Sequence, residues 1–139
     1  GRSLRQAVNL KSLKGKTINV DCDVIQADGG TRTASITGGC VALFLAIKNH
    51  HDDQRAINSL VAAVSLGIKD NKILLDLDYD EDSTADTDLN IVMNEKDELI
   101  EIQGTAEDSP FSKSELSDML HLGSSAIAEI VKKQKACIE

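Results

Sequence analysis

DVIQADGGTRTASITGG, the stretch of residues 23–39, joins a strand to a helix through a Gly-Gly turn. Residues 17–24 alternate β-branched and polar side chains, which predicts a strand ahead of the turn. After the turn, apolar residues recur at helical spacing from Thr33, and the polar run 48–55 ends the helix. The glycine pair at residues 38–39 costs roughly 1 kcal/mol per residue relative to Ala, which predicts that a neighbouring strand or subunit approaches the helix backbone closely.

The same junction predicts an anion site. Hydroxyl side chains and one guanidinium gather where the helix should begin: Thr31, Arg32, Thr33 and Ser35. The first N–H groups of a helix have no intrahelical acceptor, and the helix dipole places partial positive charge beside them. A bound phosphate is the ligand that this chemistry favours.

The rest of the chain predicts four strands followed by a helical region. A polar loop at residues 50–58 leads to the strands, which are expected at residues 61–68, 73–78, 86–94 and 99–105. Asp70-Asn71 forms the turn of the first pair, and consecutive strands favour an antiparallel meander. Residues 112–115 (SKSE) match a helix capping box, and the following apolar stripe is expected to break near Gly123. This element order predicts an α+β fold in which helices pack on a sheet.

Composition limits the classes of function. With 139 residues and 41% hydrophobic content, the chain is expected to form one domain, 1–139. A net charge of −8 and a pI near 4.8 argue against a free-standing nucleic-acid binder, so any basic surface for RNA should come from elsewhere. Cys22, Cys40 and Cys137 form no CxxC pair, which predicts reduced packing residues in a cytosolic protein.

Residues 76–88, DLDYDEDSTADTD, form a strongly acidic run. Seven carboxylates fall within these thirteen residues: Asp76, Asp78, Asp80, Glu81, Asp82, Asp86 and Asp88. At an effective dielectric of about 20, two such charges 4 Å apart repel by roughly 4 kcal/mol. A solvated acidic turn would relieve this repulsion, and so would Mg²⁺ or Mn²⁺, which prefer hard oxygen ligands. Spacing alone leaves both interpretations open.

Together these segments resemble the ribonuclease PH family, the bacterial phosphate-dependent exoribonucleases that trim the 3′ ends of transfer RNA precursors. The resemblance is carried, in the family's order, by GRSLR, DCDVIQADGGTRTASITG, VAAVSLGI, LLDLDYDEDS, ADTDLN and EIQGTAEDSPFS. It covers nearly the whole chain and implies that residues 1–139 are the C-terminal part of a subunit whose N-terminal part is absent. The implied fold is a ribonuclease PH or ribosomal protein S5 domain 2-like β-α-β sandwich, a mostly antiparallel sheet packed with helices.

The resemblance assigns the phosphate site to the Gly-Thr-Arg element. It implies that Gly30, Thr31 and Arg32 bind inorganic phosphate, with Thr33 or Ser35 as supporting donors. The planar fork of Arg32 suits two phosphate oxygens at once, which Lys would not reproduce. The alternative structural role for Arg32 is an ion pair with Asp28 or with an acid of the 76–88 run.

The resemblance assigns catalysis to a pair of aspartates six residues apart. Asp82 and Asp88 match best, as general acid or as ligands of a divalent ion, with Asp86 as a further metal ligand. Asp80 and Asp86 share the same spacing and remain an alternative pair. The implied cofactor is Mg²⁺ or Mn²⁺, and the implied co-substrate is inorganic phosphate.

The implied reaction is phosphorolysis of RNA from its 3′ end, which makes the chain a tRNA nucleotidyltransferase of the ribonuclease PH type. It releases nucleoside diphosphates from tRNA or rRNA precursors, and nucleotide addition is the reverse reaction. The intact family forms a hexameric ring, a trimer of dimers, in the cytoplasm. A chain without the N-terminal part is expected to be weak or inactive alone. The alternatives are a non-catalytic exosome-like ring subunit that guides RNA, a hydrolytic nuclease and a non-enzymatic phosphate-binding module.

Overall fold

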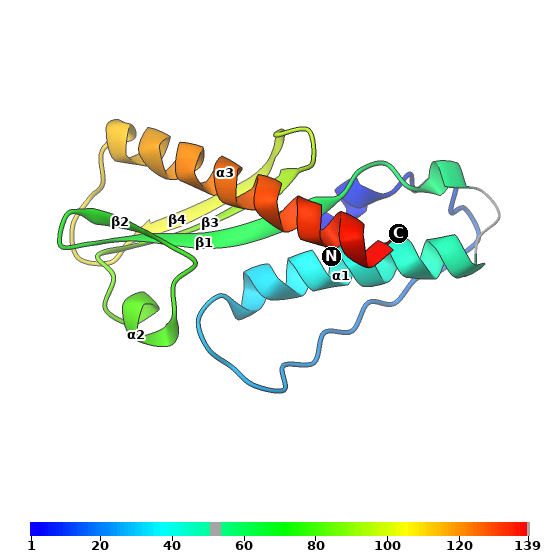
Figure 1. Cartoon of the computed structure of the whole chain (residues 1–139), viewed down its shortest axis with the longest axis horizontal. Helices are drawn as coiled ribbons and strands as arrows, with labels where there is room; N and C mark the ends of the chain where they lie inside the picture. Colours follow the sequence, from blue (N-terminus) through cyan, green and yellow to red (C-terminus); the bar gives the residue numbers. More distant parts are fainter. Residues whose placement is uncertain (51–53, 139) are drawn as a thin grey trace.

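The computed structural model has a four-stranded antiparallel sheet with two long helices packed against it (Figure 1). The structure describes residues 1–50 and 54–138, so the predicted polar loop at 50–58 lies partly outside the described residues. The elements in chain order are η1 (Ser3–Ala7), α1 (Thr31–His50), η2 (Gln54–Ala56), β1 (Val61–Lys69), β2 (Lys72–Leu75), α2 (Tyr79–Asp82), β3 (Thr87–Asn94), β4 (Leu99–Ala106) and α3 (Lys113–Ile138). The predicted α+β class is confirmed.

The first hairpin forms where the sequence predicts it. Asp70 and Asn71 have φ angles of 51° and 59°, and β1 pairs with β2 in antiparallel register on either side of them. The second strand of the hairpin is shorter than expected, because Asp76 also has a positive φ of 58° and the chain turns away. Asp78 then accepts a hydrogen bond from the Glu81 N–H and caps α2.

The strands do not form the predicted meander. The order in the sheet is β2-β1-β3-β4, so β3 pairs with β1 rather than with β2. The first eight residues of β1 are all buried, which suits a central strand. The acidic run, including α2, therefore crosses from one side of β1 to the other.

Side chains from helices satisfy the half of β1 that β2 does not reach. The Val61 N–H points to Cys40 Sγ at 3.3 Å, and the Ala63 N–H donates to Thr37 Oγ1 at 3.1 Å. Gln134 of α3 donates from Nε2 to the Val61 carbonyl at 3.0 Å. Helix α1 and the end of α3 thus occupy the place of another strand along this edge.

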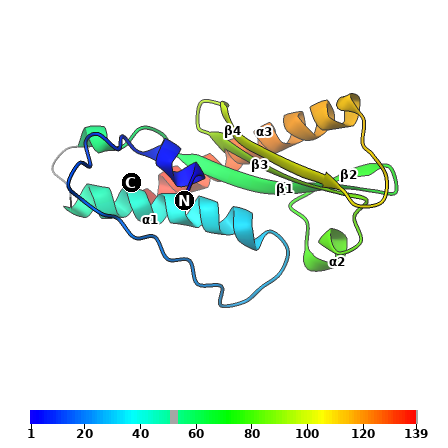
Figure 2. The ribbon, with the colours of Figure 1, turned by 180° about the vertical axis from the view of Figure 1, so that it is seen from behind.

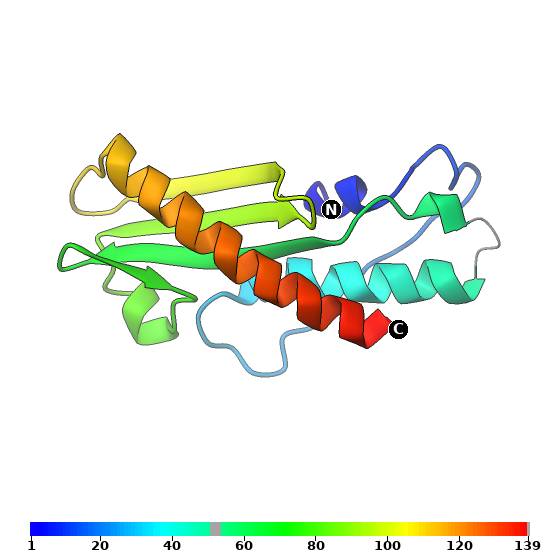
Figure 3. The same ribbon diagram turned by 45° about the horizontal axis from the view of Figure 1, so that its top comes forward.

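Helix α3 begins as predicted and continues past the expected break. Ser112 and Glu115 exchange the two hydrogen bonds of a capping box, at 2.6 and 3.2 Å. The helix runs unbroken through Gly123 across one face of the sheet (Figure 3). A Cβ at Gly123 would lie 2.9 Å from Ile91 Cδ1, so this glycine permits close packing of helix on sheet rather than a kink.

The predicted strand at residues 17–24 is wrong. This segment is extended, but within residues 1–50 and 54–138 no strand pairs with it, and a strand requires a ladder partner. It runs alongside α1 instead (Figure 2). A Cβ at Gly39 would lie 3.5 Å from Val20 Cγ1 and 3.7 Å from Cys22 Sγ. Leu4 Cδ1 would lie closer still, at 3.3 Å, so the close neighbours of Gly39 are side chains of this chain rather than the expected strand or subunit, and Gly38 has open space beside it.

Candidate functional site

The Gly-Gly turn leads directly into the first residue of α1, as predicted. Gly30 has a left-handed φ of 70°, and its carbonyl accepts hydrogen bonds from the Ala34 N–H at 2.9 Å and from Thr33 Oγ1 at 2.8 Å. Thr33 is buried, and its hydroxyl proton is already used within the loop. Thr31 and Arg32 are exposed at the helix start, where the N–H groups and the dipole favour an anion.

The Gly-Gly turn packs against the acidic run. Asp28 Oδ1 accepts hydrogen bonds from the N–H groups of Tyr79 and Gly29, both at 2.8 Å. These two bonds, the Tyr79 bond first, lower the pKa of Asp28 below its usual value. A Cβ on Gly29 would lie 1.9 Å from the Leu77 carbonyl oxygen, so only glycine fits between the two segments. The two regions that the sequence singled out are therefore in contact.

Arg32 forms an ion pair with Glu101 of β4 rather than with Asp28 or an acid of the 76–88 run. Arg32 Nη2 contacts Glu101 Oε1, and Ser3 Oγ donates to the second carboxylate oxygen at 3.4 Å. The alternative role of an ion pair is thus present, but its partner is not one of the acids that the sequence suggested. Sequence reasoning missed Glu101, because it lies 69 residues away along the chain and only its place in the EIQGTAE segment marked it.

Asp82 and Arg32 both lie within electrostatic reach of Asp88. Asp82 is the last residue of α2, and Asp88 is the second residue of β3. Partial burial raises the pKa of Asp88 above its usual value, the negative charges of Asp82 and Glu107 raise it further, and the positive charge of Arg32 opposes them. Asn90 Nδ2 donates to Asp88 Oδ1 at 3.2 Å. Glu107 and Asn90 are neighbours of Asp88 whose influence on it the sequence did not reveal.

Asp76 lies beside the Gly30 turn, with its Oδ1 3.8 Å from a Cβ built on Gly30, whereas Asp80 and Asp86 lie elsewhere in the acidic run. Asp80 is exposed on α2, and Asp86 precedes β3, where its N–H donates to the Ile68 carbonyl at 2.8 Å. Among the described residues, no three His, Cys, Asp or Glu side chains gather in a way that could hold a metal ion. Mg²⁺ commonly takes only one or two carboxylates and completes its shell with waters and substrate phosphates. Such a site would need only two carboxylates, and Asp82 and Asp88 are the pair expected from the sequence.

A groove of about 980 Å³ lies on the Arg32 side of the site. Its polar lining includes Arg2, Arg5, Lys16, Arg32, Glu101 and Gln103. Basic side chains therefore gather on one surface despite the net charge of −8. The rest of the lining is largely apolar and includes Leu4, Leu10, Leu13 and Ile18, so the groove combines positive charge with apolar surface.

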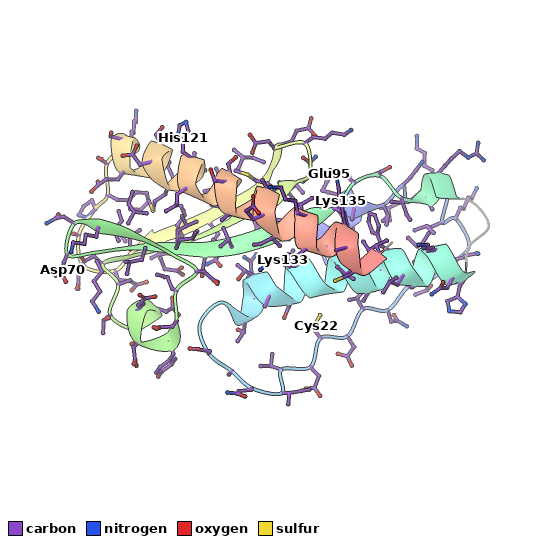
Figure 4. The ribbon with its side chains drawn as sticks, viewed as in Figure 1. Cys22, Asp70, Glu95, His121, Lys133 and Lys135 are labelled. Atoms are coloured by element: carbon purple, nitrogen blue, oxygen red, sulfur yellow. The ribbon has the colours of Figure 1, made fainter. Side chains whose placement is uncertain are left out.

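Other singled-out side chains lie elsewhere. His121 is on α3, where its Nδ1 contacts the Ser117 carbonyl at 2.7 Å (Figure 4). The free cysteines Cys22 and Cys137 are exposed, and only Cys40 is a buried packing residue as expected. No helix in the described part of the chain has the length and apolar character needed to cross a membrane.

Family comparisons match most of the chain. Residues 1–48 match the model described as the 3′ exoribonuclease family, domain 1, and residues 59–126 match that family's domain 2. The chain belongs to the 3′ exoribonuclease family. This confirms the resemblance to ribonuclease PH at the family level.

Solved structures with the same fold are longer than this chain. An archaeal exosome core has a TM-score of 0.70 and 19% identity, with 96% of this chain and 60% of that chain covered. The Archaeoglobus fulgidus exosome with RNA bound to the active site has a TM-score of 0.70 and 19% identity, covering 95% and 57%. Rice (Oryza sativa) Rrp46 has a TM-score of 0.66 and 18% identity, covering 83% and 51%. The chain thus spans between about half and three fifths of these proteins.

Proposed function

We propose that this chain carries a phosphorolytic 3′-to-5′ exoribonuclease site that acts on tRNA precursors and releases nucleoside diphosphates. The observation that supports this most directly is the contact between the Gly-Gly turn and the acidic run, through Asp28, Gly29 and Tyr79. This contact joins the helix start, as the proposed phosphate site, to the acidic run that contains the proposed catalytic carboxylates. Phosphorolysis needs both, because a phosphate attacks while a 3′-oxygen leaves.

In the proposed mechanism, the helix start binds the attacking phosphate. Gly30, Thr31 and Arg32 supply N–H groups and a guanidinium, and Thr33 supports the loop by its bond to the Gly30 carbonyl. An oxygen of the bound phosphate forms a bond to the last phosphodiester phosphorus, and the bond to the 3′-oxygen of the preceding nucleotide breaks. The products are a nucleoside diphosphate and an RNA shorter by one residue.

Asp88 is the proposed general acid for the leaving 3′-oxygen. Burial and the negative charge of Asp82 both raise the pKa of Asp88, which is the direction that favours a proton donor. Asp82, Asp88 and, as a further ligand, Asp86 would hold Mg²⁺ or Mn²⁺, which would neutralise charge on the reacting phosphates. Preorganised charge of this kind is usually the largest contribution to catalysis.

We propose that the RNA follows the groove lined by Arg2, Arg5 and Lys16, which leads to Arg32. We further propose that the chain assembles into a homo-oligomeric hexameric ring in the cytoplasm. Its free thiols are typical of a reducing compartment. Because the compared structures are substantially longer, we expect this chain alone to turn over RNA slowly or not at all.

A second candidate is a non-catalytic subunit of an exosome-like ring. One observation favours it: Glu101 pairs with Arg32, so the cation expected to bind phosphate already has a negative partner. In that case the chain would bind RNA through the groove without dependence on phosphate.

Phosphate titration separates these candidates. We expect isothermal calorimetry to detect inorganic phosphate binding to the chain in magnesium buffer, and Arg32→Ala to abolish it. Lys132→Ala is the matched control, because Lys132 is an exposed cation paired with Glu129 on α3. If the native chain binds no phosphate, the phosphorolytic proposal is refuted.

Product analysis separates phosphorolysis from hydrolysis. With labelled tRNA precursor, phosphate and Mg²⁺, any product should be a nucleoside diphosphate whose release requires added phosphate. Nucleoside monophosphates formed without phosphate would show a hydrolytic nuclease instead.

A further inference from the structure

We propose that Glu101 is a positioning residue that orients the Arg32 guanidinium toward bound phosphate. This inference rests on the proposed phosphate site and adds a residue to it. Glu101 lies on β4 opposite Val92 of β3, so its backbone is held by the sheet. Its two carboxylate oxygens contact two elements that are distant in sequence, through Arg32 of α1 and Ser3 of η1.

Arg32 is the more flexible member of the ion pair and therefore the one that needs positioning. Arg32 is the second residue of α1, and its side chain is 44% exposed, compared with 28% for Glu101. A half-exposed arginine has many rotamers, and fixing one long side chain on binding costs roughly 0.5–1.5 kcal/mol, a factor of about 2 to 12 in affinity. The ion pair with Glu101 already restricts the Arg32 side chain in the free protein. Less conformational entropy is therefore lost when phosphate binds.

The anchored guanidinium keeps donors for a ligand. Glu101 Oε1 contacts Nη2, and a guanidinium has five N–H donors in a rigid plane. The contact to Glu101 uses Nη2, so the N–H groups of Nε and Nη1 remain as donors for phosphate oxygens. The positive charge of Arg32 also opposes the rise in the pKa of Asp88, so the guanidinium lies within electrostatic reach of that carboxyl group.

A competing role for Glu101 makes the opposite prediction. If its charge mainly repelled phosphate or competed for Arg32, removing that charge would tighten phosphate binding. We favour positioning because Glu101 is fixed by the strand backbone and by Ser3 as well as by Arg32. A carboxylate held from several sides suits a fixed support better than a displaceable competitor.

Two substitutions of Glu101 separate the loss of its hydrogen-bond acceptor from the loss of its negative charge. Glu101→Ala removes the acceptor, whereas Glu101→Gln keeps an amide oxygen for Arg32 and removes the negative charge. Glu129→Gln is the control for net charge, because Glu129 is 67% exposed in a surface pair with Lys132. Each full-length variant is titrated with inorganic phosphate in magnesium buffer by calorimetry, and its thermal unfolding is recorded.

We expect Glu101→Ala to weaken phosphate binding about three- to tenfold, Glu101→Gln to stay within about twofold of the native chain, and Glu129→Gln to have no effect. Tighter binding by both Glu101 variants, or unchanged binding by Glu101→Ala, would overturn positioning while leaving the phosphate site intact. A third outcome would also overturn positioning: both Glu101→Ala and Glu101→Gln bind phosphate more weakly, and both unfold at a lower temperature. Absence of phosphate binding by the native chain would refute the proposed function and this inference together.

Discussion

Replacing Gly29 by alanine should separate the phosphate-binding turn from the acidic run. The added Cβ would lie 1.9 Å from the Leu77 carbonyl oxygen and 2.7 Å from the Asp78 carbonyl carbon. Since Cβ atoms essentially never approach other heavy atoms closer than 3.0 Å, the two backbones must move apart by about 1 Å. Gly29 does not have a left-handed φ, so the clash alone, and not the backbone conformation, opposes alanine.

The size of the effect follows from the contacts that must change. Overpacking a tight contact costs typically about 1–3 kcal/mol, and loss of the Asp28 bond to the Tyr79 N–H removes about 1 kcal/mol more. We therefore expect Gly29→Ala to lower the free energy of unfolding by about 2–4 kcal/mol. Phosphate affinity should fall as well, because Gly30 and Arg32 move with the turn.

Gly38→Ala is the matched control. Gly38 is an exposed glycine within α1, and no atom lies within 4 Å of a Cβ built there. Alanine at this site should raise the free energy of unfolding by up to about 1 kcal/mol through helix propensity. The assay is urea unfolding of both variants, followed by phosphate titration. If Gly29→Ala were as stable as the native chain and bound phosphate equally, the tight contact between turn and acidic run would be refuted.

Two further predictions concern the sheet and the carboxylate pair. Thr37→Val should lower the free energy of unfolding by about 1–3 kcal/mol, because it leaves the buried Ala63 N–H without its acceptor. Urea unfolding measures this change. Thr105→Val is the control, because Thr105 is exposed on β4 and its replacement should change stability little. Asp88→Asn should stabilise the fold near pH 7 while removing activity. The raised pKa means that folded Asp88 binds a proton more tightly than unfolded Asp88, so its charge lowers stability at neutral pH and this penalty fades in acid. The stability gain of Asp88→Asn should therefore shrink as the pH falls through the normal aspartate range, and a gain independent of pH would contradict the assigned cause.

Local patterns predicted most of the secondary structure. The Asp70-Asn71 turn, the capping box at Ser112 and the helix after Gly30 each depend on a few adjacent residues, and all three are present. The expected break at Gly123 was wrong, because that glycine serves packing against Ile91 in another element. The expected strand at 17–24 was wrong because pairing depends on a neighbour that the local pattern does not contain.

For the candidate site too, the sequence predicted the local chemistry but not the long-range contacts. The sequence alone singled out the glycine turn, Arg32 and the acidic run, because helix starts and carboxylate clusters have recognisable local chemistry. It could not reveal that Arg32 pairs with Glu101, or that Glu107 and Arg32 act electrostatically on Asp88.

The sequence by itself determined the order of the four strands and the helical regions before and after them, but not the short helix α2; it also determined the family and the two candidate chemical regions, since these reside in short stretches of adjacent residues. Only the tertiary structure decided that β1 is central and that Gly29 packs against Leu77. It also decided that Glu101 rather than Asp28 holds Arg32. The physical reason is that these contacts join residues dozens of positions apart, which meet only when the β2-β1-β3-β4 sheet and its helices pack together.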